Sequence, residues 1–189
     1  MGSEMCIRDS SSLVAAVREA SKRILGTGRS NQKEPMPRDF LQSIVDRADL
    51  SNDLELRNVC LYVLCFVVFL RFDHVSRVKR NEISFHSGYM SIKVEKSKND
   101  QLRQGDEVLI AEGEGATCPV KILKEYSNMF NIYPMSNEFI FRQLIKTKNS
   151  YKLACNNKPV SYSTFRDHLR KSLRGFASDP QVYDTHSFR

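Results

Sequence analysis

The sequence predicts an α+β fold that is mainly helical and carries a small antiparallel sheet. Three observations predict it. Apolar residues recur every three or four positions in several stretches, as they do on one face of a helix. An apolar run of twelve residues, Val59 to Leu70, marks a buried central helix. Short alternating or β-branched segments follow Arg80 and indicate strands. At 189 residues, the chain is long enough for one full domain with a packed core.

The first 34 residues are expected to lie outside that domain. Residues 1–10 are expected to be non-native or disordered, because Met5 to Ser10 resembles a translated sequencing adapter; an ordinary disordered terminus is the alternative. Residues 11–34 are predicted to hold an amphipathic helix from Leu13 to Leu25. A polar, glycine-containing linker from Gly26 to Met36 follows it, and we place the domain boundary between residues 34 and 35.

Two helices are predicted to open the main domain. Pro37 suits a first helical turn, and the apolar stripe behind it stops before Ser51. The polar triplet Ser51 to Asp53 is then expected to cap a helix over residues 54–70, which is apolar on all sides. That helix is predicted to end at Arg71, the first polar residue after it.

Strands and two more helices are predicted for the rest of the chain. Residues 82–85, 89–95 and 107–111 are expected to form the antiparallel sheet, with turns at residues 86–88 and 97–105. Cys118 and Pro119 are predicted to begin a helix that runs to Phe130. Residues 139–144 are apolar but ambiguous. Ser161 is expected to cap a last helix, which carries Phe165, Leu169 and Leu173 at helical spacing.

Composition narrows the function classes. The net charge of +7 and the pI of about 9.2 favour an anionic partner. Five cysteines without a C-x-x-C pair disfavour a disulfide framework and a zinc site, and the histidines lack partners at metal-ligand spacing. We therefore expect no metal and no other cofactor. The longest apolar run is too short for a bilayer and no secretion signal is visible, so an intracellular protein without a membrane partner is expected.

Four polar residues are candidates for one site: Arg71 after the apolar helix, Lys98 in the hairpin turn, and His186 with Arg189. Residues three apart on a helix share a face, so His186 and Arg189 are expected to point the same way. Two guanidinium groups and an amine around one point would hold a phosphodiester, because arginine offers a planar fork that matches phosphate oxygens.

The segments around these residues resemble the tyrosine recombinase (phage integrase) family in order and spacing. The resemblance covers residues 34–189 and is nearest to recombinases of eukaryotic mobile elements, while the helix from Leu13 to Leu25 resembles the end of the family's preceding core-binding domain. The matching stretches are Phe69-Leu70-Arg71-Phe72-Asp73-His74-Val75, Glu95-Lys96-Ser97-Lys98-Asn99-Asp100-Gln101 and His186-Ser187-Phe188-Arg189.

The resemblance implies a role for each candidate. Arg71 and Arg189 would hold the scissile phosphate of double-stranded DNA, Lys98 would protonate the leaving 5′-oxygen, and His186 would assist proton transfer. A tyrosine would attack the phosphate and form a 3′-phosphotyrosyl link without a cofactor, and a second strand would reverse the reaction. The whole family member would act as a tetramer on DNA, in the nucleus if the host is eukaryotic.

The sequence departs from the family pattern at two places. Where the family has a carboxylate three residues after the first arginine, this chain has His74, with Asp73 one position earlier. The family's nucleophilic tyrosine follows the His-x-x-Arg box, but no tyrosine here follows His186, and Tyr183 is expected to be a packing residue. The resemblance therefore implies a catalytic domain truncated before its nucleophile, inactive as it stands and monomeric.

Less specific interpretations stay open for each feature. Arg71 alone could be a surface cation at a helix end, and Lys96 rivals Lys98 among the charges of the hairpin. The phenylalanines at positions 66, 69 and 72 are expected to pack in the core. The alternative functions are a noncatalytic DNA-binding protein derived from a mobile element, and a helical protein-interaction domain whose basic charge serves solubility.

Overall fold

The computed structural model describes residues 12–25, 33–94, 106–148 and 150–188, which belong to two units that divide between Gln32 and Lys33. The first unit contains helix α1 (Ser12–Leu25), which confirms the helix expected there. Its apolar side chains Val14, Val17 and Ile24 are exposed. The relation of this helix to a core-binding domain stays a prediction.

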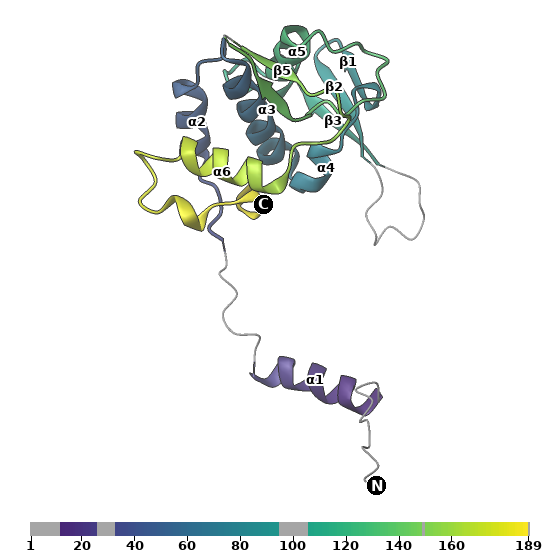
Figure 1. The fold of residues 1–189 in the computed structure, drawn as a ribbon, viewed down its shortest axis with the longest axis vertical. Coiled ribbons are helices and arrows are strands. Elements are labelled where there is room, and N and C mark those ends of the chain that lie inside the picture. Colours follow the sequence, from purple (N-terminus) through teal and green to yellow (C-terminus); the bar gives the residue numbers. More distant parts are fainter. Residues whose placement is uncertain (1–11, 26–32, 95–105, 149, 189) are drawn as a thin grey trace. The chain divides into compact units, whose positions relative to one another are not determined.

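Helix α3 (Asp53–Val68) forms the centre of the second unit. Every side chain from Leu56 to Cys65 is buried; the apolar run predicts this from Val59 onward, and the polar Arg57 and Asn58 are buried as well. The helix begins as expected, because the side-chain oxygen of Asn52 accepts hydrogen bonds from the backbone N–H groups of Leu54 (3.0 Å) and Glu55 (3.4 Å). It packs against α2 (Arg38–Arg47), α5 (Pro119–Met129) and α6 (Tyr162–Ser172), which surround it in Figure 1.

The expected three-stranded antiparallel sheet is present. Strands β1 (Ile83–His86), β2 (Tyr89–Val94) and β3 (Asp106–Ala111) lie in sequence order, with Ile83 opposite Ile92 and Met90 opposite Ile110. These four side chains are buried and join the core. The fold class expected from the sequence, mainly helical with a small antiparallel sheet, is therefore what the structure shows.

The end of the central helix differs from the prediction. Helix α3 stops at Val68, two residues early, because Phe69 adopts a left-handed backbone conformation (φ 51°). The Phe69 side chain is 70% exposed, so the expectation that it packs in the core was wrong. A five-residue helix, α4 (Phe72–Ser76), follows and was not foreseen. The chain thus turns sharply just before Arg71.

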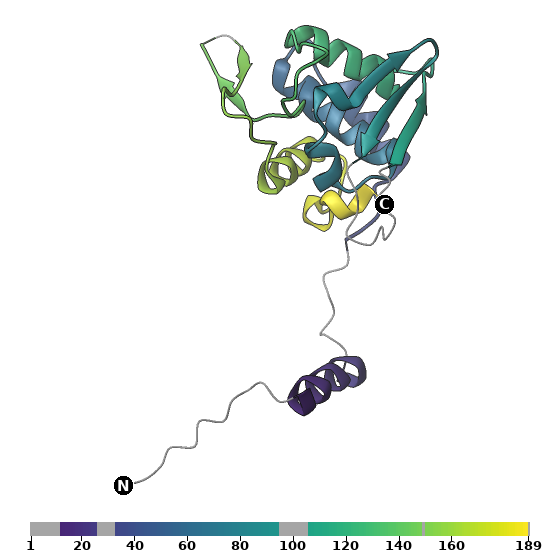
Figure 2. The same ribbon diagram turned by 90° about the vertical axis from the view of Figure 1, so that its right-hand side faces the viewer.

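The ambiguous segment 139–144 is not helical, and Phe139 and Arg142 form isolated β-bridges with Lys79 and Pro159. Ile140 and Phe141 are buried in it, and the chain continues into a hairpin of β4 (Leu144–Lys146) and β5 (Tyr151–Leu153). Figure 2 shows this hairpin and the three-stranded sheet on opposite sides of the helices. Helix α6 follows the hairpin, with the Ser161 hydroxyl accepting a hydrogen bond from Thr164 N–H (3.2 Å), as expected of its cap.

The end of the expected linker belongs to the folded unit. The backbone N–H of Glu34 donates to the Val182 carbonyl (3.1 Å), and that of Met36 donates to the Ser187 carbonyl (2.6 Å). Met36 is buried. The extended chain before α2 therefore holds two short 3₁₀ turns in place, η2 (Pro180–Val182) and η3 (Thr185–Phe188). Within the described ranges, no helix is long and apolar enough to cross a membrane.

Candidate functional site

Arg71 and His186, which are far apart in the sequence, line the same small cavity of about 80 Å³. Both side chains are exposed, so their polar groups can meet a ligand from solvent. Helix α4 and the C-terminal turn lie side by side in Figures 1 and 2. The remaining lining residues are Phe72, Asp73, Tyr162 and Thr185.

Arg71 is positioned by the turn that ends α3. It is the N-cap residue of α4. Its carbonyl accepts hydrogen bonds from the N–H groups of His74 (2.8 Å) and Val75 (3.1 Å). The neighbouring Phe72 is buried, with its ring centroid 4.6 Å from that of Phe165 on α6. This aromatic contact fixes the start of α4 against α6 and leaves Arg71 at the surface.

His186 projects from a turn that is braced by the buried carboxylate of Asp184. One carboxylate oxygen of Asp184 accepts a hydrogen bond from the backbone N–H of His186 (2.8 Å). The other accepts one from the hydroxyl of Tyr162 (3.2 Å) on α6. Next to them, the ring of Phe188 is buried near those of Tyr62 and Phe165. The His186 ring is therefore presented by a fixed backbone.

Tyr162 and Asp184 are site residues that the sequence analysis missed. Burial, and next the negative charge of Asp184, raise the pKa of Tyr162, so this phenol stays protonated and donates to the carboxylate. An Asp two residues before the histidine fits a side-chain-to-backbone turn, which was the available sequence signal. The pairing with Tyr162 needs the fold, because the two residues are brought together from different elements.

Over the described residues, the structure shows no carboxylate that braces Arg71 as the family resemblance implies. Among the described residues, no carboxylate lies within 4.0 Å of the Arg71 guanidinium, although Asp73 lines the same cavity. His74 is half-buried one residue further on. The guanidinium thus keeps its hydrogen-bond donors available for a ligand.

The other two expected site residues cannot be placed, since Lys98 and Arg189 lie outside the described residues. His186 sits in a 3₁₀ turn rather than in an α-helix. Tyr183 is a packing residue, as expected: its buried ring contacts Phe40, and its hydroxyl donates to Glu34. Across the part of the chain that the structure describes, no three His, Cys, Asp or Glu side chains are grouped as metal ligands would be.

Two solved structures of the XerH site-specific recombinase are similar to this chain. The pre-cleavage complex with the difH substrate has a TM-score of 0.55 and 13% sequence identity, and the match covers 86% of this chain and 43% of that one. The post-cleavage complex with palindromic difH substrate has a TM-score of 0.54 and 16% identity, over 84% and 41% of the two chains. The chain thus spans less than half the length of these recombinases.

Neither a family model nor a curated protein matches the sequence. The likeness at 13% to 16% identity therefore bears on the fold. It confirms the expected fold class, because XerH shares the mainly helical domain with a small antiparallel sheet.

Proposed function

We propose that the chain is the DNA-binding and phosphate-holding part of a tyrosine-recombinase catalytic domain, which serves DNA recombination or integration in a mobile element of eukaryotic type. The observation that carries the proposal is the meeting of Arg71 and His186 in one cavity. The fold that they occupy is similar to that of XerH bound to its difH substrate, which supports double-stranded DNA as the partner.

The chemistry of the two side chains suits a phosphodiester. Arg71 would donate two parallel hydrogen bonds to the non-bridging oxygens, and the His186 ring would donate a third or move a proton. Positive groups fixed before the reaction stabilise the charge that builds on those oxygens in the transition state. Both groups come from braced backbone, so the substrate would not have to order them.

The complete reaction would add groups from outside this pair. Arg189 would hold the phosphate beside Arg71. The attacking tyrosine oxygen would form a bond to phosphorus as the bond to the 5′-oxygen breaks, and Lys98 would give that oxygen its proton. A 5′-hydroxyl of the second strand would then attack the phosphotyrosine and release the tyrosine.

We expect the attacking tyrosine to be none of the seven in these 189 residues. None of the seven follows His186 in the sequence. Tyr162 lies in the cavity, but its hydroxyl donates a hydrogen bond to the Asp184 carboxylate. We infer that these 189 residues bind DNA without cleaving it, as a monomer, inside the cell and in the nucleus of a eukaryotic host.

Duplex binding tests the proposal. Arg71→Gln should weaken binding of a labelled duplex about tenfold, because a charge-assisted contact to phosphate is lost, and should reduce the salt slope by about one. Arg77→Gln, an exposed arginine just after α4, is the matched control and should change affinity less. A protein that binds no duplex at low salt, or equal losses in both variants, would overturn the proposal.

A noncatalytic DNA-binding protein is the second candidate, because no described carboxylate braces Arg71 and the tyrosine in its cavity is hydrogen-bonded to Asp184. Trapping on a nicked duplex tests for cleavage by the chain itself. We expect no covalent complex with these 189 residues. A denaturation-resistant complex that disappears in Tyr162→Phe would show cleavage by this chain and contradict that expectation.

A further inference from the structure

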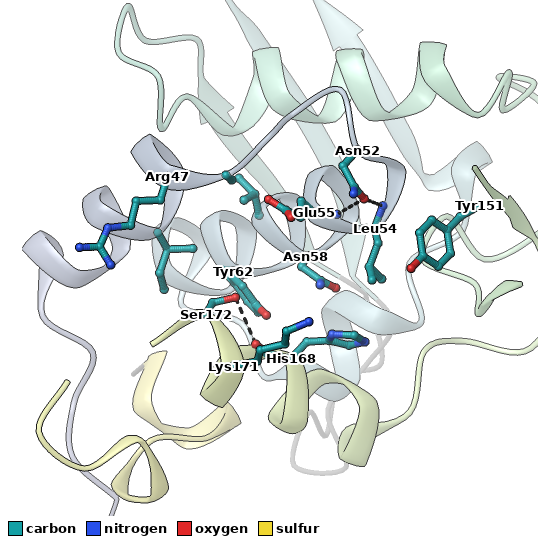
Figure 3. Close-up of a pocket in the computed structure, with 13 residues that line it drawn as sticks. Arg47, Asn52, Leu54, Glu55, Asn58, Tyr62, Tyr151, His168, Lys171 and Ser172 are labelled. Carbon is teal, nitrogen blue, oxygen red and sulfur yellow. Dashed lines mark hydrogen bonds between the residues drawn. The ribbon is translucent and has the colours of Figure 1, made fainter. Parts of the chain in front are cut away.

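A second cavity, of about 320 Å³, lies between α2, α3 and α6 and shares no lining residue with the Arg71 and His186 cavity. Figure 3 shows the polar side chains that line it. Asn58 and Tyr62 come from α3, His168 and Lys171 from α6, and Tyr151 from β5. A partly enclosed space of this volume is in the range that small-molecule sites occupy.

Asn58 lines this cavity, and its side-chain amide carries two hydrogen-bond donors. The side-chain oxygen of Asn58 accepts hydrogen bonds from two guanidinium nitrogens of Arg57, at 3.3 and 2.9 Å. The NH₂ group of the same Asn58 amide does not take part in these bonds and can donate to a ligand. In Figure 3 the Asn58 side chain points toward His168 and Lys171, and the Tyr151 hydroxyl faces the same space.

The buried hydroxyl of Tyr62 is a further polar group of the cavity lining. Tyr62 is 1% exposed, and its hydroxyl, which faces Ser172, has no hydrogen bond of good geometry among the described residues. The Ser172 hydroxyl instead donates to the backbone oxygen of His168 (3.1 Å). A buried hydroxyl without a partner is costly, so a ligand that reached Tyr62 would recover that cost.

The surroundings of the cavity are positively charged. Arg57 is 1% exposed, and over the described ranges no carboxylate forms an ion pair with it. Burial, followed by the positive charges of Arg57 and Lys171, lowers the pKa of His168. Arg47 also lines the cavity. Glu55 is the carboxylate among the lining residues, and it accepts a hydrogen bond from Asp49 N–H (2.8 Å). An anion would offset the unpaired charge of Arg57.

We propose that this cavity binds a small organic anion through its phosphate or carboxylate group. The anionic oxygens would accept hydrogen bonds from the Asn58 amide, the Lys171 amine and the hydroxyl of Tyr151. The carbon skeleton would pack against Leu54 and Val59, which supply apolar lining. This inference is independent of the recombinase proposal, because it uses different residues and a different ligand.

Histidine ring signals in an NMR titration test the inference, with inorganic phosphate in one arm and succinate in the other. The chain has four histidines, of which His168 reports on this cavity and His186 on the first one. We expect at least one of the two anions to shift the His168 signals saturably. The arm that responds more tightly identifies the preferred oxyanion.

Variants then assign the binding to the cavity. Lys171→Gln should weaken the affinity read at His168 about tenfold, because a charged donor is lost. Lys121→Gln, an exposed lysine on α5 outside the lining, should leave that affinity unchanged. Arg71→Gln should remove any response of His186 to phosphate and leave that of His168 intact, which separates this inference from the recombinase proposal.

Asn58→Asp is a second variant that preserves the support of Arg57. The aspartate keeps an oxygen for the Arg57 guanidinium but replaces the donors that face the cavity with an anionic oxygen. We expect unfolding stability to be retained and anion binding at His168 to be lost. The inference fails if neither anion shifts His168 saturably, or if Lys171→Gln and Lys121→Gln bind the anion equally well.

Discussion

Asp184 joins the two polypeptide segments that meet at the candidate site, because its carboxylate bonds both the His186 backbone and the Tyr162 hydroxyl. Asp184→Ala would remove both of these hydrogen bonds at once. We expect it to lower the free energy of unfolding by about 1 to 3 kcal/mol, measured by urea denaturation. Tyr162→Phe removes one of the two bonds and should cost less, about 1 kcal/mol.

Asp184→Asn is the conservative control, since it keeps an oxygen for the His186 N–H and should recover most of the lost stability. If Asp184→Ala is no more destabilising than Tyr162→Phe, the bond to His186 does not brace the turn.

At the scale of residues, the sequence analysis named Arg71 and His186 as candidates, because a guanidinium and an imidazole suit phosphate chemistry, and the structure places both in one cavity. Asp184 and Tyr162 were missed, because their roles depend on a hydrogen bond between elements distant in the chain. The exposure of Phe69 was also missed, since the pattern gave no sign of its left-handed conformation.

Helix α6 carries Tyr162 into the site, and its first turn depends on Ser161. The Ser161 hydroxyl accepts a hydrogen bond from Thr164 N–H (3.2 Å), which satisfies one of the open donors at the helix start. Ser161→Ala should lower the free energy of unfolding by about 1 kcal/mol. Ser161→Asp keeps an acceptor at the same place and should remain close to the original protein in the same thermal or urea measurement. A loss of equal size in both variants would show that the cap bond is not the cause.

Helix α3 makes the stability of the protein sensitive to alkaline pH. Burial raises the pKa of the Cys65 thiol to about 12 and raises the pKa of Cys60 and Tyr62 above their ordinary values. These groups hold their protons more tightly in the folded state than in the unfolded state. Stability should therefore be complete below the ordinary thiol pKa of 9.0 and fall as the pH rises above it.

Urea denaturation at a series of pH values measures this loss, with an expected slope of up to about 1.4 kcal/mol per pH unit for each buried group. Cys65→Ala removes one such group and should make the slope shallower. A free energy of unfolding that stays constant well above the ordinary thiol pKa would contradict the burial of these thiols.

The long helices and the three-stranded sheet were predictable, whereas α4 and the β4–β5 hairpin were not. The boundaries of α1, α5 and α6 follow periodicity and capping residues, which act locally. Helix α4 and the β4–β5 hairpin have three to five residues per element, too few for a period to show. These elements are stabilised by contacts with neighbouring segments. For example, the Asp53 side chain of α3 accepts a hydrogen bond from the N–H of Tyr151 in β5 (2.7 Å).

At the scale of the whole molecule, the chain divides into two units between Gln32 and Lys33, so N-terminal truncation tests which residues stabilise the second unit. Removal of residues 1–32 should leave the melting temperature of the second unit unchanged. Removal of residues 1–36 also deletes buried Met36 and its bond to Ser187, and should lower the free energy of unfolding by about 2 to 4 kcal/mol. Equal stability of the two truncated proteins would show that the extended segment does not support the C-terminal turns.

The fold class was predictable because hydrophobic periodicity and strand alternation act throughout the chain. The meeting of Arg71 with His186 was implied by the resemblance to a family, since no local rule brings the end of α3 next to η3. The linker prediction was wrong between Lys33 and Met36. The polar and proline residues there gave no sign that the backbone would form hydrogen bonds with the distant turns η2 and η3. The cavity around Asn58 had no sequence signal, because its lining comes from separate elements.

A double-mutant cycle between Arg71 and His186 on duplex affinity tests the central claim most directly. If both side chains hold the same phosphate, the loss in Arg71→Gln with His186→Gln should differ from the sum of the single losses by about 0.5 to 3 kcal/mol. The same cycle between Arg77 and His186 should be additive. Losses that add for Arg71 and His186 as well, or single variants that bind DNA like the original protein, would contradict a shared phosphate site.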